Sequence, residues 1–128
     1  MRQALVVDDD LVTTQMLKFW LRRAGYTVTT VRLPSAALAE LAATNYDVIF
    51  VDLRLPEMDG LELCRQIRAL ATTPIFVLSA STDQNDRIGA MEAGADGYLT
   101  KPFDPPDLIA RVTAAVAKRQ VDAEESAG

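Results

Sequence analysis

The stretch from Val48 to Gly60 reads Val-Ile-Phe-Val-Asp-Leu-Arg-Leu-Pro-Glu-Met-Asp-Gly and contains the features that decide the fold. Its first four residues are apolar and mostly β-branched, without polar alternation, which is typical of a strand covered on both faces. Asp52 follows this strand at once, and a turn containing Pro56 begins a few residues later. Because that turn lies downstream, Asp52 is not required as a turn residue. It is expected at the carboxyl end of a buried strand.

Two other apolar runs have the same character, Ala4 to Val7 and Ile75 to Leu78. Weaker strand signals lie at Thr27 to Val31 and at Gly97 to Thr100. Apolar residues at helical spacing separate all of these runs. We therefore expect five strands that alternate with five helices.

Each predicted helix has apolar residues at helical spacing that we expect to face the core. The helices lie near 12–24 (Val12, Met16, Leu17, Trp20, Leu21), from Pro34 onward (Leu38, Leu41), at 60–70 (Leu61, Cys64, Ile67, Leu70), near 83–93 (Ile88, Met91) and at 105–118 (Leu108, Ile109, Val112, Val116). Each crossover between parallel strands must be right-handed, so this alternation implies helices on both faces of one sheet. The predicted fold class is α/β, a doubly wound (βα)5 parallel sheet.

The size of the chain limits its domain organisation. Its 128 residues, 49% of them hydrophobic, are enough for one sizeable core but too few for two ordinary domains. From Gln120 onward the chain is acidic and has no apolar face. We expect one domain over residues 1–119, followed at 120–128 by an acidic tail or the start of a linker.

Composition also excludes several classes of function. The net charge of −5 opposes contact with a nucleic-acid backbone or an anionic membrane surface. The apolar run near the N-terminus is far too short for a signal segment or a membrane span, so we expect a cytoplasmic protein. The chain has no histidine, which excludes a Ser/His/Asp triad, a histidine metal site and a histidine phosphodonor of its own.

Polar residues follow four of the predicted strands. Asp8 and Asp9 follow the first, Asp52 the third and Ser79 the fourth, while Lys101 follows the fifth. Ligands of open α/β sheets bind at this carboxyl edge, and gathered carboxylates call for a hard cation with oxygen ligands. Magnesium, with manganese as an alternative, fits this set. Such a site suits phosphoryl transfer, with Asp52 as nucleophile and with Lys101 and the Ser79 hydroxyl holding phosphoryl oxygens.

Four segments also carry a resemblance to a known family: Leu5-Val6-Val7-Asp8-Asp9-Asp10, the stretch from Val51 to Gly60, Leu78-Ser79-Ala80, and Ala-Gly-Ala-Asp-Gly-Tyr-Leu-Thr-Lys-Pro-Phe at 93–103. In this order they closely resemble the response-regulator receiver family of two-component signalling, over roughly residues 3 to 119. The resemblance implies a flavodoxin-like sheet with strand order 2-1-3-4-5. It also implies a phosphoacceptor rather than an enzyme that turns over a free substrate.

The resemblance further implies the roles of single residues. Asp52 would accept a phosphoryl group from a phosphohistidine on a histidine kinase or histidine phosphotransfer protein. Asp9 and Asp52, with Asp8 close by, would hold Mg²⁺ together with the backbone carbonyl of Arg54. Arg54 and Ser81, each two positions beyond a site residue, would influence how long the phosphoryl group survives. The Lys101-Pro102 bond is usually cis in the family.

Switching is the second implication of the resemblance. After transfer, Ser79 would move toward the phosphoryl group, and Tyr98 would turn inward to fill the space. The fourth helix, fifth strand and fifth helix would then present an altered surface to an output domain or a downstream protein. Related transcription regulators dimerise through this face, where Asp96 and Arg111 are the candidate pair for a phosphorylation-dependent dimer.

Two other classes of function remain as alternatives. The segment Asp8-Asp9-Asp10-Leu11-Val12-Thr13 also satisfies the signature of haloacid dehalogenase phosphatases, although that family would leave Asp52 and its surroundings unexplained. A binding module with a receiver fold that is never phosphorylated is the other alternative. For Asp10 and Asp59 we prefer plain structural roles, as a helix cap and a turn former.

Overall fold

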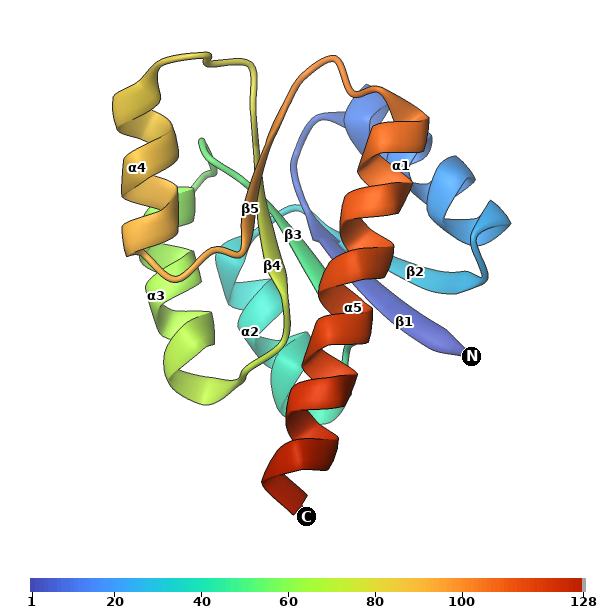
Figure 1. The fold of residues 1–128 in the computed structure, drawn as a ribbon. Coiled ribbons are helices and arrows are strands. Elements are labelled where there is room, and N and C mark those ends of the chain that lie inside the picture. The colour runs from blue at the N-terminus through green and yellow to red at the C-terminus, as the bar shows by residue number, and fades with distance from the viewer. Residues whose placement is uncertain (128) are drawn as a thin grey trace.

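The apolar run that begins at Val48 forms β3 (Val48–Asp52), the central strand of the sheet in the computed structural model, which describes residues 1–127. The other elements are β1 (Arg2–Val7), α1 (Leu11–Arg23), β2 (Tyr26–Val31), α2 (Pro34–Ala43), α3 (Gly60–Leu70), β4 (Ile75–Ser79), α4 (Gln84–Glu92), β5 (Gly97–Thr100) and α5 (Pro105–Ala127). All strand pairs are parallel and the order is β2-β1-β3-β4-β5, which confirms the predicted doubly wound (βα)5 fold (Figure 1).

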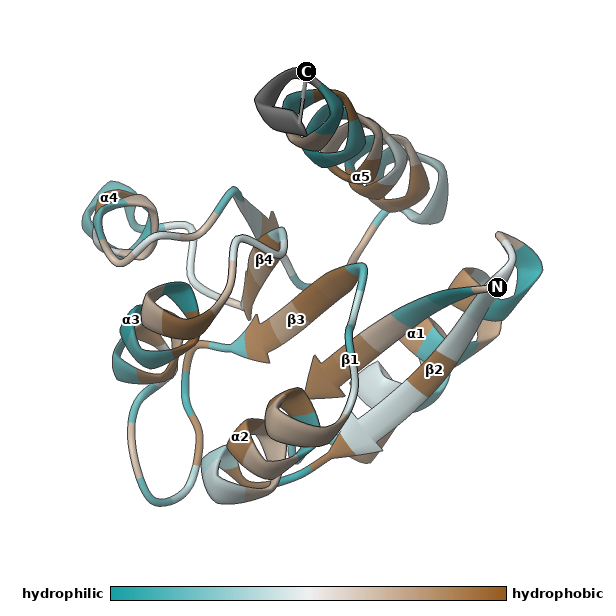
Figure 2. Ribbon diagram, turned by 90° about the horizontal axis from the view of Figure 1, so that it is seen from below, coloured by the Kyte–Doolittle hydropathy of each residue, from teal (hydrophilic) through white to brown (hydrophobic). Residues whose placement is uncertain are grey.

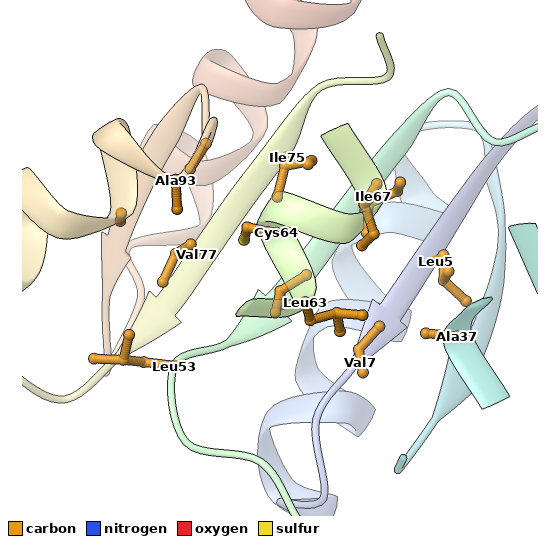
Figure 3. Packing of buried hydrophobic residues seen from close by; sticks show 14 of the residues in the cluster. Leu5, Val7, Ala37, Leu53, Leu63, Cys64, Ile67, Ile75, Val77 and Ala93 are labelled. Carbon is orange, nitrogen blue, oxygen red and sulfur yellow. The ribbon is translucent and has the colours of Figure 1, made fainter. Parts of the chain in front are cut away.

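Helices cover both faces of the sheet, and the alternation of side chains along each strand decides which helices a residue meets (Figure 2). In β1, Leu5 and Val7 face the layer formed by α2, α3 and α4, whereas Ala4 and Val6 face α1 and α5. Figure 3 shows the first layer, where Ile67 of α3 packs into this cluster. Each large side chain that is fully buried in this way contributes roughly 1.5–3 kcal/mol to stability.

The register of the strands brings their carboxyl ends to one edge. Val7 of β1 lies opposite Val51 of β3, so the residues that follow them, Asp8 and Asp52, leave the sheet next to each other. Asp52 in turn lies opposite Leu78, one residue before Ser79. The pairing of β1, β3 and β4 therefore places three predicted site residues at one end of the sheet.

The predicted core faces of α1 and α3 are only partly correct. In α1 the buried apolar residues are Leu17 and Leu21, whereas Val12 is 73% exposed. In α3 Cys64 and Ile67 are buried as predicted, but Leu70 is 70% exposed. The two exposed residues lie in terminal turns, the parts of a helix that have the least of the sheet beneath them.

The predicted core face of α4 is wrong. Ile88 and Met91 are 46% and 47% exposed, and Ala90 is the buried residue of this helix. Small side chains at Ala90 and Ala93 let α4 approach the sheet closely, so the longer apolar side chains beside them face outward. Periodicity locates the helix here but does not locate its buried face.

The last helix is longer than predicted. Residues 120–127, expected to be part of an acidic tail or the start of a linker, continue α5 to Ala127. Residues such as Ala123 and Glu124 are strong helix formers, so a helix that is already nucleated by packing at Leu108 and Val112 propagates through them. Within residues 1–127, no helix combines the length and the apolar character needed to cross a membrane.

Candidate functional site

Three carboxylates meet at the ends of β1 and β3. Oxygens of Asp8, Asp9 and Asp52 all lie within 4.8 Å of one another. Asp8 is 1% exposed and Asp52 is 9% exposed, whereas Asp9 is open to solvent. Three like charges at this spacing repel one another, so the group requires compensation by cations.

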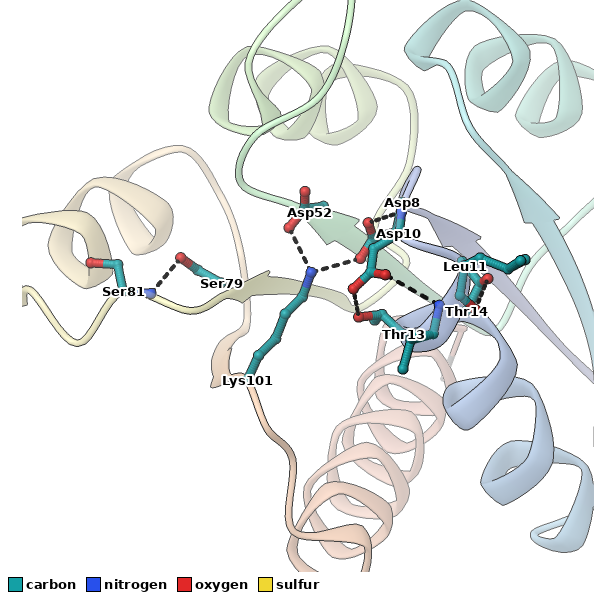
Figure 4. A network of polar contacts seen from close by, with 10 residues as sticks. Asp8, Asp10, Leu11, Thr13, Thr14, Asp52, Ser79, Ser81 and Lys101 are labelled. Carbon is teal, nitrogen blue, oxygen red and sulfur yellow. Dashed lines mark hydrogen bonds and ion pairs between the residues drawn. The ribbon is translucent and has the colours of Figure 1, made fainter.

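Lys101 supplies one compensating charge from the segment that follows β5. Its Nζ donates to Oδ2 of Asp8 at 3.0 Å and to Oδ1 of Asp52 at 3.2 Å, as Figure 4 shows. The side chain of Lys101 is only 20% exposed, so it is not the solvated surface lysine that composition alone would suggest. The Lys101-Pro102 peptide bond is cis, as the family resemblance implied.

The charges in the cluster shift the pKa values of two of its members. Burial is the main cause that raises the pKa of Asp52, and the neighbouring Asp8 carboxylate adds to it, while Lys101 opposes it. Burial alone would lower the pKa of Lys101, but its contacts with Asp8 and Asp52 outweigh burial and raise it. Lys101 therefore stays charged, and the carboxylates around it still carry an excess of negative charge.

Asp8 is held in place by two donors. Besides Lys101 on Oδ2, the backbone N–H of Asp10 donates to its Oδ1 at 2.9 Å. Asp10 itself is the N-cap of α1, where its side chain accepts from the Val12 N–H and from the Thr13 hydroxyl. The bond from Thr13 is the main cause that lowers the pKa of Asp10. The structural role preferred for Asp10 is confirmed.

The loop after β3 fits tightly against Asp52. A methyl group at Gly60 would overlap the backbone carbonyl oxygen of Asp52 and come within 2.9 Å of Leu53 Cα, so only glycine fits. Asp59, predicted to be a turn former, is the N-cap of α3. Glu57 has a φ of 70° and accepts from both the N–H and the hydroxyl of Ser35. The loop is thereby tied to the first turn of α2.

A pocket of about 460 Å³ lies beside the cluster. Its lining consists of Asp52, Leu53, Arg54, Ser79, Ala80, Ser81 and Lys101. The Ser79 hydroxyl accepts from the N–H of Ser81 at 3.0 Å, and Ser79 does not cap α4, because Asp83 occupies that position. The pocket therefore brings together the predicted nucleophile Asp52, the Ser79 hydroxyl, the Lys101 ammonium and Arg54.

Tyr98 of β5 is already buried with its ring turned inward, the position that the resemblance implied only after phosphoryl transfer. Its hydroxyl donates to the backbone carbonyl of Ser81 at 2.9 Å. This bond connects the strand to the loop that carries Ser79.

The Asp96–Arg111 pair is predicted for a dimer, and within the described part of one chain each of these residues has another partner. Asp96 accepts from Arg68 Nη2 at 2.7 Å and from the N–H of Ile75, while Arg111 pairs with Asp107 on its own helix. Arg68 lies nearer because α3 ends beside the turn that carries Asp96. A pair between the two copies of a dimer stays a prediction.

One polar residue near the pocket was not predicted from the sequence. Asp86, in the first turn of α4, accepts a hydrogen bond of 2.6 Å from the hydroxyl of Ser81. A single aspartate in the first turn of a helix is common, since it favours the helix dipole, and no pattern in the sequence distinguishes this one. Its partner is determined only by the path of the loop.

Comparison with known proteins agrees with this geometry. The family model of the response regulator receiver domain matches residues 4–113. The transcriptional regulatory protein ResD of Bacillus subtilis is 40% identical over 110 residues, which are 86% of this chain and 46% of ResD. The transcriptional regulatory protein KdpE of Mycobacterium tuberculosis is 40% identical over 124 residues, 97% of this chain and 55% of KdpE. The chain thus spans about half the length of these curated relatives.

Solved structures share the fold over nearly the whole chain. A putative response regulator from Chloroflexus aurantiacus has a TM-score of 0.86 at 38% identity, covering 91% of this chain and 98% of that one. The receiver domain of a Francisella response regulator has a TM-score of 0.86 at 33% identity, covering 93% and 99%. Since sequence and fold agree over this length, the chain belongs to the family of response regulator receiver domains.

Proposed function

We propose that this receiver domain takes a phosphoryl group onto Asp52 from a phosphohistidine of a histidine kinase or histidine phosphotransfer protein. The observation that carries the proposal is the position of the Lys101 ammonium, within 3.2 Å of both Asp8 and Asp52 at the edge of a pocket. Phosphoryl transfer depends mainly on positioning and charge stabilisation, and these residues supply both.

In the transfer, a carboxylate oxygen of Asp52 would attack phosphorus in line with the bond to the donor. A phosphorus–oxygen bond forms, the phosphorus–nitrogen bond of the phosphohistidine breaks, and the electron pair returns to the imidazole, which takes a proton from solvent. Lys101 and the hydroxyl of Ser79 would hold oxygens of the moving group. This chain has no histidine, which is consistent with a donor on another molecule.

The acidic cluster fits a divalent cation. Its donors are all oxygen, and three carboxylates with one ammonium leave two negative charges, which Mg²⁺ or Mn²⁺ would neutralise. Asp9 and Asp52 would bind the ion together with the backbone carbonyl of Arg54, with Asp8 close by in the same cluster. When bound, the ion supplies charge neutralisation at the incoming phosphoryl oxygens.

The output surface we propose consists of α4, β5 and α5. Grooves of about 360 and 410 Å³ lie along it, and Arg87, Tyr98 and Arg111 line both. The half-exposed Ile88 and Met91 add apolar area next to these charges, a mixture typical of a recognition surface. An output domain or a downstream protein, or a second copy in a phosphorylation-dependent dimer, would bind here.

The test is incubation with acetyl phosphate and Mg²⁺ followed by mass spectrometry of the intact protein. We expect the mass of one phosphoryl group in the wild type and none in Asp52→Asn, because the amide is not a nucleophile. EDTA should also prevent the modification.

Asp10→Asn is the matched control, since it removes a neighbouring carboxylate and keeps a residue that caps helices well. It should be modified like the wild type. Modification that persists in Asp52→Asn would show that another residue is the acceptor. Steady turnover of free phosphomonoesters would instead favour the haloacid dehalogenase class.

A further inference from the structure

Helix α4 is held to the molecule by few apolar contacts. Ala90 is its buried residue, whereas α3 buries Leu63, Cys64 and Ile67. A helix with so little buried apolar area has low local stability, so the polar contacts at its ends decide its position.

Ser81 makes the polar contacts at the N-terminal end of α4. Its hydroxyl donates to Oδ2 of Asp86 at 2.6 Å and accepts from the N–H of Asp83 at 3.1 Å. Its N–H donates to the Ser79 hydroxyl at 3.0 Å, and its carbonyl accepts from the Tyr98 hydroxyl. One residue thereby contacts the candidate site, the first turn of α4 and the buried ring of β5.

Arg68 makes the contacts at the other end of α4. Its Nε and Nη2 donate to the carbonyl of Gly94 at 3.0 and 2.7 Å, next to the C-cap of the helix. Its Nη1 donates to the carbonyls of Thr73 and Ala71, and Nη2 also contacts Asp96. None of these partners lines the pocket at Asp52, so this end of α4 is tied to α3 and β4 independently of the site.

We propose that Ser81 is the positioning residue that transmits the position of Ser79 to the first turn of α4, while Arg68 keeps the last turn fixed. This role rests on the proposed function of Ser79 as a group that turns toward the phosphoryl oxygens. When the hydroxyl of Ser79 moves, the N–H of Ser81 loses or shifts its acceptor, and the hydroxyl of Ser81 carries the displacement to Asp86. Helix α4 then moves at its N-terminal end.

The test is a double-mutant cycle of Ser79→Ala and Ser81→Ala in the unphosphorylated protein, followed by amide hydrogen exchange in α4. We expect each single variant to speed exchange at residues 86–88 by roughly fivefold, the effect of losing one hydrogen bond. In the double variant the second change should add less than twofold. Exchange at residues 90–93, next to the Arg68 contacts, should stay within twofold of the wild type.

Three further variants make the cycle specific. Ser81→Thr keeps the hydroxyl and should restore slow exchange at residues 86–88. Asp86→Ala removes the same hydrogen bond from the helix side, so its effect on exchange should not add to that of Ser81→Ala. If Ser79→Ala does not fold, the pair Asp86→Ala and Ser81→Ala replaces the first cycle. Thr13→Ala breaks a hydroxyl–carboxylate bond of equal length at α1 and should leave α4 unchanged.

The proposal is overturned if Ser79→Ala still speeds exchange at residues 86–88 fivefold when Ser81 is already alanine. It is also overturned if the effects of Asp86→Ala and Ser81→Ala on this exchange add. Because the cycle uses unphosphorylated protein, it decides the role of Ser81 even if Asp52 proves not to accept a phosphoryl group. Failure of the acetyl phosphate test would count against the proposed function alone.

Discussion

At the scale of single residues, the negative charge of Asp52 is unfavourable in the absence of a cation. Burial and the neighbouring Asp8 raise its pKa, and Lys101 compensates only in part. An acid with a raised pKa in the folded state contributes stability at pH values below its unfolded pKa, and loses that contribution as the pH rises through the folded pKa. Ionised Asp52 therefore opposes folding at neutral pH.

We expect Asp52→Asn to raise the free energy of unfolding in EDTA at pH 7 by roughly 0.5–2 kcal/mol, the range for relieving an unfavourable charge. The gain should shrink as the pH is lowered through the folded-state pKa of Asp52, because the wild-type carboxyl then becomes neutral too. Urea unfolding between pH 7 and pH 4 measures it. A gain that is independent of pH would show that packing, not charge, is responsible.

Cys64 belongs to a reactive residue type, but its burial in the fold makes it unreactive. It is fully buried, and burial raises the pKa of its thiol to about 12. We expect a disulfide reagent at pH 8 to label native Cys64 at least 100 times more slowly than the urea-unfolded chain, because the thiolate is the reactive form. Rapid labelling of the native protein would mean that α3 opens frequently.

At the scale of elements, the connection from β3 to α3 determines where Asp52 lies. Gly60 begins α3 against the backbone of Asp52 and Leu53, and its N–H donates to the carbonyl of Leu53 at 2.9 Å. Glu57 joins the same connection to α2 through Ser35. β3, α3 and α2 thus meet at the loop in which the sequence predicted a turn.

We expect Gly60→Ala to destabilise the protein by roughly 1–3 kcal/mol, because the added methyl overlaps backbone that has no room to move. Phosphoryl uptake from acetyl phosphate should slow as well, since the displaced backbone carries the nucleophile. Gly25→Ala is the comparison, because a side chain there meets no atom within 4 Å, although its φ of 96° strains any residue other than glycine. Equal uptake rates in both variants would contradict a role of Gly60 in placing Asp52.

At the scale of the whole molecule, α5 extends from the packed domain to Ala127. Leu108, Val112 and Val116 bury one face of its first half, while residues 121–124 are exposed. We expect a chain that ends at Arg119 to fold with a Tm within about 3 °C of the full chain, because residues 120–124 bury little apolar area. A larger loss would show that the domain does not end near residue 119.

The sequence by itself determined the elements and the residues at the carboxyl edge. Buried parallel strands have continuous apolar runs, and the residues that follow such strands must gather at one edge, so Asp8, Asp52, Ser79 and Lys101 were predictable before any coordinates. The order of these residues along the chain also supported the family resemblance, which the comparisons confirm.

Only the tertiary structure decided which partners these residues and the helices have. Ile88 faces outward because Ala90 lets α4 lie close to the sheet, and Asp96 pairs with Arg68 of the same chain because α3 ends nearby. The contact of Ser81 with Asp86 likewise depends on the path of one loop. Periodicity and motif spacing describe one segment at a time, whereas these contacts depend on distances between segments that are set by packing.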